Sequence, residues 1–231
     1  MLRECAPDGT FPNAVNAFLV KTPDRNILID AGLGKKLFDN LHAVNLTPGQ
    51  IDIILITHMH GDHIGGLLRD GKVMFPQAEL YLPQPEYDYW MSDGKFKQQQ
   101  DVIAAYKSRL HLFKPGEPGR EGAPLLPGFT AYAACGHTPG HTAFLLESGD
   151  EKMFVWGDVA HAMALQMPYP QVAVTYDVNP DDAIAARKQV LEYVSRHKIP
   201  IAGMHIAFPS MGTVSRRQAG GYLFTPFPGA D

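Results

Sequence analysis

The sequence THMHGDH, residues 57–63, decides the fold, because four metal-ligand side chains directly follow an apolar run. That run, residues 51–56, is nearly continuous in isoleucine and leucine and predicts a strand buried on both faces. The first two histidines are two positions apart and project the same way from extended chain, whereas the aspartate and the last histidine are adjacent and diverge. The segment therefore predicts ligands for two neighbouring metal sites. The candidate ligands are His58, His60, Asp62 and His63.

Three later ligand-type residues each follow a predicted apolar strand. They are His137 in CGHTPGH (135–141), Asp158 in FVWGD (154–158) and His205 in GMH (203–205). A glycine near each one lets backbone approach without a clashing side chain. Imidazole and carboxylate ligands without thiolate suit catalytic zinc, with manganese, cobalt and iron as alternatives. A lone histidine is more often a core or surface residue, but four ligand-type residues within six positions argue against that interpretation.

These pieces, in this order, resemble the metallo-β-lactamase fold superfamily over nearly the whole chain, from about Asn13. The resemblance implies an α/β fold, a four-layer αββα sandwich, formed by residues 1–231 as a single domain. It also implies two divalent metal ions with assigned ligands. His58, His60 and His137 would hold one ion, Asp62, His63 and His205 the other, and Asp158 would bridge both.

Within that superfamily the chain resembles the lactonase and methyl-parathion-hydrolase-like branch, through residues 138–142 and 158–161 and a tail from Gln166 through Asp177 to Tyr222. Lactonases that quench quorum sensing usually have a tyrosine three residues after the bridging aspartate. This chain has His161 there, as the organophosphate-hydrolase-like members do, and we expect His161 to donate to a substrate oxygen.

Other branches fit less well. Dedicated β-lactamases usually have cysteine or serine near the position of Asp158. Hydroxyacylglutathione hydrolases carry a C-terminal helical domain, for which the residues after His205 are too few. Compared with the lactonase branch the chain also begins late, so we expect a short first strand and a short N-terminal arm.

The expected function is a dinuclear metal-dependent hydrolase that uses a metal-bridging hydroxide to cleave an ester-type bond. The bond is that of a phosphotriester, a lactone or an aryl ester, and the expected catalytic residues are Asp62, Asp158 and His161. Alternatives are a thioesterase, a β-lactamase-like hydrolase and an iron-binding oxygenase-type member of the fold. A purely structural metal site is disfavoured, because closed structural zinc sites favour cysteine.

The composition limits the classes of binding partner that can be expected. The formal net charge of −4 and the pI of about 6.2 give no electrostatic reason to expect nucleic acid or an anionic membrane. We expect a small-molecule substrate and, as in relatives, a homodimer. The start, Met1–Cys5, lacks the apolar segment of a secretory signal, which favours the cytoplasm unless a signal was removed upstream. Cys5 and Cys135 are expected to be reduced thiols.

The periodicity predicts strands at 15–20, 26–30, 51–56, 129–134, 142–147, 152–156 and 199–202, and helices at 35–46, 62–68, 96–113 and 179–197. Asn179-Pro180 is a helix start, with an N-cap followed by proline at the first helical position. The stretch 70–128 is rich in proline and aromatic residues.

Several residues have a functional and a plainer interpretation. Asp30 and Thr57 are expected to hydrogen-bond to ligand imidazoles, with a turn cap as the alternative for Asp30. Pocket candidates, for which core packing is at least as plausible, are Phe11, Met163, Phe208 and Tyr222. Ordinary packing is also favoured over a pocket cap or dimer contact for Tyr81, Tyr87, Tyr89 and Trp90. Surface positions are expected for His42, His111 and His197.

Overall fold

The computed structural model describes residues 5–117 and 122–229. Residues 1–4 of the start discussed above, and residues 118–121 of the proline-rich stretch, lie outside the described residues. The chain divides into two compact units. We call Val15–Lys114 the N-terminal unit, and Pro115–Asp231 together with Met1–Ala14 the C-terminal unit. The prediction of a single domain stays a prediction.

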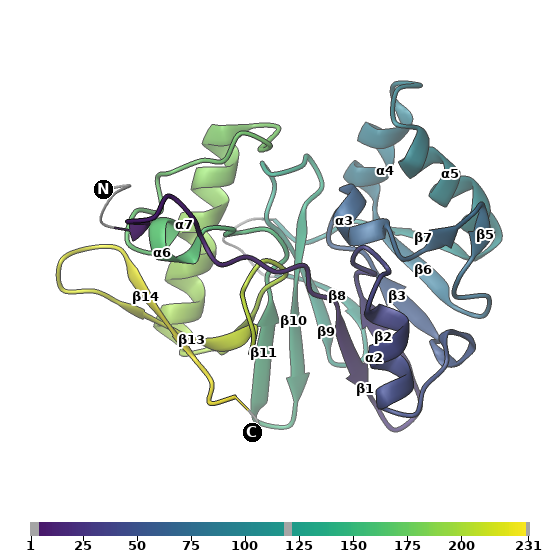
Figure 1. Cartoon of the computed structure of the whole chain (residues 1–231), viewed down its shortest axis with the longest axis horizontal. Coiled ribbons are helices and arrows are strands. Elements are labelled where there is room, and N and C mark those ends of the chain that lie inside the picture. Colours follow the sequence, from purple (N-terminus) through teal and green to yellow (C-terminus); the bar gives the residue numbers. More distant parts are fainter. Residues whose placement is uncertain (1–4, 118–121, 230–231) are drawn as a thin grey trace. The chain divides into compact units, whose positions relative to one another are not determined.

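The N-terminal unit is built on a five-stranded sheet in the order β1-β2-β3-β6-β7 (Figure 1). Its strands are β1 (Phe18–Lys21), β2 (Asn26–Ile29), β3 (Ile53–Leu55), β6 (Glu79–Pro83) and β7 (Leu110–Phe113). Only β1 runs antiparallel, to β2, and the other neighbours pair in parallel. Every residue of β3 is buried, as the apolar run predicted.

Helices pack on this sheet through one apolar cluster, in which Leu28, Ile54 and Leu80 from the strands meet Leu41 and Val102 from the helices. The helices are α2 (Leu37–Ala43), α3 (Gly61–Ile64), α4 (Gln84–Met91) and α5 (Lys97–Tyr106), with 3₁₀ turns η1 (Pro48–Gln50) and η2 (Lys107–Arg109). A small hairpin joins β4 (Leu68–Arg69) to β5 (Lys72–Val73).

The predicted helix at 96–113 is wrong in its last part. The helix α5 ends at Tyr106, and Leu110–Phe113 form β7, which pairs in parallel with β6. No glycine or proline lies between the two elements, so no local signal marks the end of the helix. The predicted helix at 62–68 is also too long. It ends at Ile64, after which the backbone N–H of Gly66 donates to the carbonyl of Gly32 instead of to a helical carbonyl.

The C-terminal unit is built on a seven-stranded sheet in the order β14-β13-β12-β11-β10-β9-β8. Adjacent strands of this sheet are antiparallel, except that β11 and β12 run in parallel. The strands are β8 (Ala123–Leu126), β9 (Phe129–Ala133), β10 (Thr142–Ser148), β11 (Glu151–Val155), β12 (Ile201–Ala202), β13 (Met211–Arg216) and β14 (Tyr222–Pro226). The last two strands and the short helix α6 (Met163–Gln166) were not predicted.

The long helix α7, Pro180–His197, packs on the sheet of the C-terminal unit (Figure 1). Its apolar side places Val190, Leu191 and Val194 against Phe154 and Ile201 of the strands. The predicted start is confirmed, because the Asn179 side chain accepts a hydrogen bond from the backbone N–H of Asp182. Each unit is thus a sheet with helices packed on it, which is consistent with the predicted α/β sandwich. None of the described helices is long and apolar enough to cross a membrane.

Candidate metal centre

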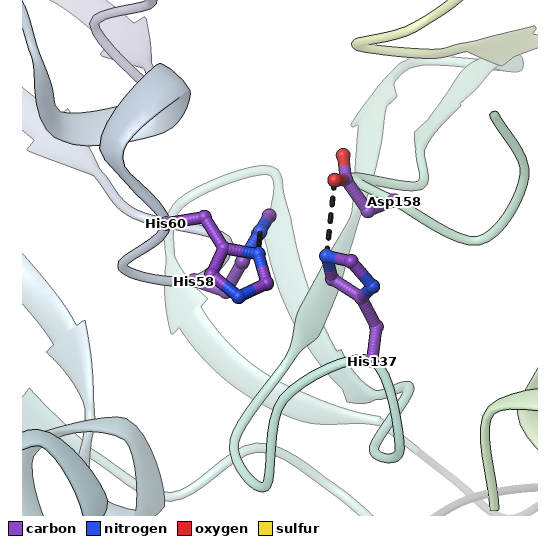
Figure 2. A group of neighbouring side chains, drawn as sticks. All are labelled: His58, His60, His137 and Asp158. Carbon is purple, nitrogen blue, oxygen red and sulfur yellow. Dashed lines mark hydrogen bonds and ion pairs between the residues drawn. The ribbon is translucent and has the colours of Figure 1, made fainter. Parts of the chain in front are cut away.

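Four candidate ligands of the N-terminal unit form one cluster, which we call the N-terminal cluster: His58, His60, Asp62 and His63. They lie where the chain leaves β3 and enters α3. His58 and His63 are fully buried, and their ring centroids are 3.9 Å apart. The Nε2 atom of His58 lies 3.0 Å from Nδ1 of His60 (Figure 2). The turn from a buried strand into a short helix therefore gathers these imidazoles, as the spacing predicted.

A buried carboxylate braces this cluster. Asp30 accepts hydrogen bonds from the backbone N–H of Thr57 at 2.8 Å, from the Thr57 hydroxyl at 2.7 Å and from Nδ1 of His63 at 2.7 Å. The Thr57 oxygen in turn lies 3.1 Å from Nδ1 of His58. Burial raises the pKa of Asp30, although its hydrogen-bond donors oppose that shift. The predicted hydrogen bonds from Asp30 and Thr57 to candidate ligand imidazoles are confirmed.

A second brace holds the backbone between the first two histidines. The N–H of Met59 donates to the buried carboxylate of Glu86 at 3.0 Å, and the Met59 carbonyl accepts from Gln99 at 2.9 Å. The indole N–H of Trp90 donates to the same Glu86 oxygen at 2.5 Å. Helices α4 and α5 thus fix the peptide that orients His58 and His60. This brace was not predicted, because α4 was not predicted.

The C-terminal cluster consists of His137, Asp158, His161 and His205, all of them buried. One carboxylate oxygen, Oδ2 of Asp158, lies 3.1 Å from Nε2 of His137, 3.0 Å from Nε2 of His161 and 3.1 Å from Nε2 of His205. Figure 2 shows the contact between His137 and Asp158. The structure therefore gathers the two predicted ligand histidines of this unit, together with His161, around the predicted ligand carboxylate of Asp158.

Hydrogen bonds at the far side of two rings decide where their protons lie. Nδ1 of His137 lies 2.9 Å from a carboxylate oxygen of Asp177, and Nδ1 of His205 lies 2.8 Å from the carbonyl oxygen of Ala14. Carbonyl and carboxylate oxygens only accept, so each Nδ1 carries a proton. In a neutral ring Nε2 is then an acceptor, and it faces Asp158, which is also an acceptor. Such contacts need a cation between them or a second proton on the ring.

That donor set fits a divalent metal ion. Imidazole Nε2 atoms whose Nδ1–H groups donate to oxygens, grouped around a carboxylate, are the arrangement that metal sites use to fix ring orientation. Without metal, protons fill the same role. Burial alone would lower the pKa of His137, but hydrogen bonds to Asp158 and Asp177 raise it above its usual value. The assignment of individual ligands stays a prediction.

Another histidine, His141, holds the backbone at Asp158. Its Nδ1 donates to the carbonyl of Ala134 at 2.8 Å, and its Nε2 accepts from the N–H of Asp158 at 2.9 Å. Gly136, which precedes His137, has φ of +128°, and a Cβ there would lie 2.0 Å from the nitrogen of Ala183. The loop before His137 therefore presses directly against the start of α7, where only glycine fits.

His161 differs from the other imidazoles of its cluster. Its Nε2 contacts Asp158, but Nδ1 has no hydrogen-bond partner among the described residues. Its backbone N–H donates to the Gln166 side chain at 2.8 Å. Burial lowers the pKa of His161, against the opposing effect of Asp158. Nδ1 is therefore the nitrogen of this ring that no described residue uses, and Nε2 can carry the proton that Asp158 accepts.

Most of the remaining candidates pack as their plainer interpretations predicted, but Phe208, for which core packing was the alternative, is exposed. Tyr87, Tyr89 and Trp90 pack on the apolar core of the N-terminal unit, and Tyr81 stacks on His111. Met163 and Tyr222 pack on the core of the C-terminal unit. Phe11 is half-buried, whereas Phe208 is 78% exposed. The predicted surface positions are confirmed for His42, His111 and His197, and the two cysteines form no disulfide.

Comparison with known proteins bears on this site. A family model described as the metallo-beta-lactamase superfamily matches residues 10–197. The solved structure of AidC, a dizinc quorum-quenching lactonase in complex with a product, is similar to this chain with 26% identity and a TM-score of 0.87. That match covers 95% of this chain and 81% of AidC.

Two curated relatives have other activities in their names. The acyl-coenzyme A thioesterase MBLAC2 of Gallus gallus is 28% identical over 202 residues, which cover 80% of this chain and 69% of the relative. The exodeoxyribonuclease WalJ of Streptococcus pneumoniae is 47% identical over 104 residues, which cover 44% of this chain. The matched region spans only 35% of the length of WalJ.

Proposed function

The chain belongs to the metallo-beta-lactamase superfamily, as its sequence predicted, and from that premise we propose that it is a hydrolase with two divalent metal ions. Family membership and the lactonase and thioesterase relatives support a metal-dependent hydrolase. The observation that carries the proposal is the contact of two imidazole Nε2 atoms, those of His137 and His205, each at 3.1 Å from a single oxygen of Asp158. A cation would turn these contacts from repulsive to attractive.

The proposed ligands are the seven that the resemblance assigns. As that resemblance implies, His58, His60 and His137 would hold one ion, Asp62, His63 and His205 would hold the other, and both ions would share Asp158. Zinc is the proposed metal, because it suits histidine and carboxylate ligands and because AidC is described as dizinc. Manganese, cobalt and iron suit the same ligands and remain alternatives.

Divalent ions bound there would supply Lewis acidity and make water acidic enough to attack near neutral pH. The residues of the chain do the positioning. Asp30 and Asp177 each take the Nδ1 proton of one ligand histidine and so hold the ring orientation. His161 is proposed to donate a hydrogen bond to an oxygen of the substrate from Nε2, the ring nitrogen that contacts Asp158.

The proposed substrate is a small molecule with an ester-type bond: a lactone, an aryl ester or a phosphotriester. The likeness to AidC supports a lactone, and His161 in place of the usual lactonase tyrosine supports the wider range. A thioester is the second candidate, because the match to the thioesterase MBLAC2 covers 80% of this chain. A homodimer in the cytoplasm stays the expectation from the sequence.

A hydrolysis screen of metal-analysed protein tests the proposal. Purified chain is loaded with zinc, its metal content is measured, and lactones, aryl esters, phosphotriesters, thioesters, a cephalosporin and single-stranded DNA are offered side by side. We expect about two zinc ions per chain and turnover of an ester-type substrate that stops on chelation. Hydrolysis of DNA alone, as the name of WalJ suggests, would replace this substrate class, and no hydrolysis by the zinc-loaded chain would refute the proposal.

A further inference from the structure

An arginine of the C-terminal unit is buried beside the C-terminal cluster. Arg187 lies on α7 and is 1% exposed. Arginine is almost never fully buried unless its charge is paired and its N–H groups are satisfied. The hydrogen bonds and the ion pair of this guanidinium account for its burial.

Arg187 is tied to two segments that carry the cluster. Its Nε donates to the carbonyl of Val159 at 2.7 Å, in the residue directly after Asp158. Its Nη1 donates to the carbonyls of Pro170 and Val172 at 3.0 and 2.7 Å. Its Nη2 lies 4.0 Å from the carboxylate of Asp177. The rigid fork of one guanidinium thus spans the chain around Asp158 and the loop that leads to Asp177.

A second side chain joins the same two segments. Gln166 accepts from the backbone N–H groups of His161 and Ala162 at 2.8 and 3.0 Å, and donates to the carbonyl of Val172 at 3.0 Å. The Val172 carbonyl therefore receives hydrogen bonds from both Gln166 and Arg187. This double attachment leaves the loop little freedom to shift relative to Asp158 and His161.

The route from Arg187 to His137 runs through Asp177. One oxygen of Asp177 accepts from Nδ1 of His137 at 2.9 Å, and the other accepts from the backbone N–H of Val174 at 3.0 Å. The only cationic side chain in contact with Asp177, apart from His137, is Arg187 among the described residues. A fixed positive charge at that distance favours the carboxylate that orients the ring of His137.

We propose that Arg187 is a positioning residue that sets the alignment of Asp158 and His137 for metal binding, through the Val159 carbonyl and the Asp177 carboxylate. This inference rests on the metal centre of the proposed function. Loss of the guanidinium lowers zinc affinity, since residues behind metal ligands typically contribute about 10- to 100-fold in affinity. A guanidinium that only filled the core would change folding stability and leave metal affinity unchanged.

Matched variants of the full chain separate these roles. Arg187→Met removes the charge at similar length, and Arg187→Lys keeps a charge that cannot reach all of these oxygens at once. Asp177→Asn keeps Arg187 and removes the carboxylate, which provides a test if the arginine variants fold poorly. Lys188→Met is the control, because it removes a neighbouring charge from the exposed side of the same helix.

Zinc affinity is measured by competition with a chelator, cobalt substitution gives a visible spectrum that reports ligand geometry, and thermal unfolding is followed without metal. We expect about 10- to 100-fold weaker zinc binding and an altered cobalt spectrum in both arginine variants and in Asp177→Asn. The Lys188→Met variant keeps wild-type values. Wild-type affinity and spectrum in both arginine variants, with only a lower unfolding temperature, would overturn the positioning role, whatever the effect of Asp177→Asn. Wild-type protein that binds no zinc would instead remove the proposed function itself.

Discussion

The two clusters of candidate ligands are built in different ways. The N-terminal cluster comes from one segment of seven residues, 57–63, and two nearby helices hold its backbone through Glu86 and Gln99. The C-terminal cluster comes from three loops that are far apart in sequence, each following a strand of one sheet. Its loops are tied together by long polar side chains, Gln166 and Arg187.

The two clusters show that ligands close in sequence and ligands far apart in sequence are brought together by different interactions. Where ligands are local, the chain geometry of a strand end already groups them, and the surrounding residues only stiffen that geometry. Where ligands are dispersed, their grouping depends on the register of β9, β11 and β12 and on side chains that join the loops. The C-terminal cluster should therefore respond more strongly to changes outside the ligand set.

The largest expected effect separates the shared ligand from a local one. Asp158→Ala should abolish turnover and lower the bound metal more than His60→Ala does, because Asp158 contacts three imidazoles and His60 is proposed to serve one ion. Metal per chain and kcat/KM of the two variants check this. Wild-type turnover by folded Asp158→Ala would contradict the ligand assignment.

The next effect compares the carboxylates behind the two clusters. Asp30→Asn and Asp177→Asn should each weaken zinc binding by about 10- to 100-fold, because each loses the anionic acceptor of a ligand imidazole. Asp30→Asn should be the more severe, since Asp30 also accepts two hydrogen bonds from Thr57. Chelator competition measures both variants, with the exposed Asp88→Asn as control. Equal affinity in wild type and Asp30→Asn would show that the buried brace does not act on the metal.

A smaller effect concerns the brace at Met59. Glu86→Gln should lower the stability of the N-terminal unit by about 1–3 kcal/mol, because a buried anionic acceptor for two N–H groups is lost. The chain has two tryptophans, one in each unit, so Trp90 and Trp156 report the units separately. Denaturant unfolding followed in single-tryptophan variants measures the change. An unchanged midpoint at Trp156 with a lower one at Trp90 is expected, and coincident shifts would show that the units unfold together.

The last effect is absent at neutral pH and is confined to alkaline solution. Burial raises the pKa of Tyr106, in the core of the N-terminal unit, from 10.0 to about 12. The unfolded chain then loses this proton before the folded chain does, so stability falls as the pH rises from 10 through 12. The shift corresponds to at most about 2–3 kcal/mol. Tyr106→Phe should reduce this fall but not abolish it, because burial also raises the pKa of Tyr193. Denaturant unfolding at pH 9 and pH 11.5 measures the change. An equal alkaline loss in the variant would assign the effect to another group.

The sequence predicted the strands and helices that bracket the candidate ligands, because their hydrophobic patterns are strong and their ends carry clear signals. The buried run before His58 and the Asn179 cap are examples. The prediction from sequence missed β7, where a helix passes into a strand without glycine or proline, and it also missed β13 and β14. Hydrophobic pattern alone does not locate such boundaries, because strand pairing partners decide them.

The family, the mixed α/β fold and the candidate ligands can be inferred from the order of residues, since ligand-type residues directly follow apolar strands. The residues that stand behind these ligands become visible only when the chain is folded. Glu86, Gln99 and Arg187 look like ordinary polar residues of helices in the sequence, and their burial against Met59 and Val159 follows from how those helices pack. Hydrogen bonds between residues 27 to 40 positions apart depend on packing, which no local pattern encodes.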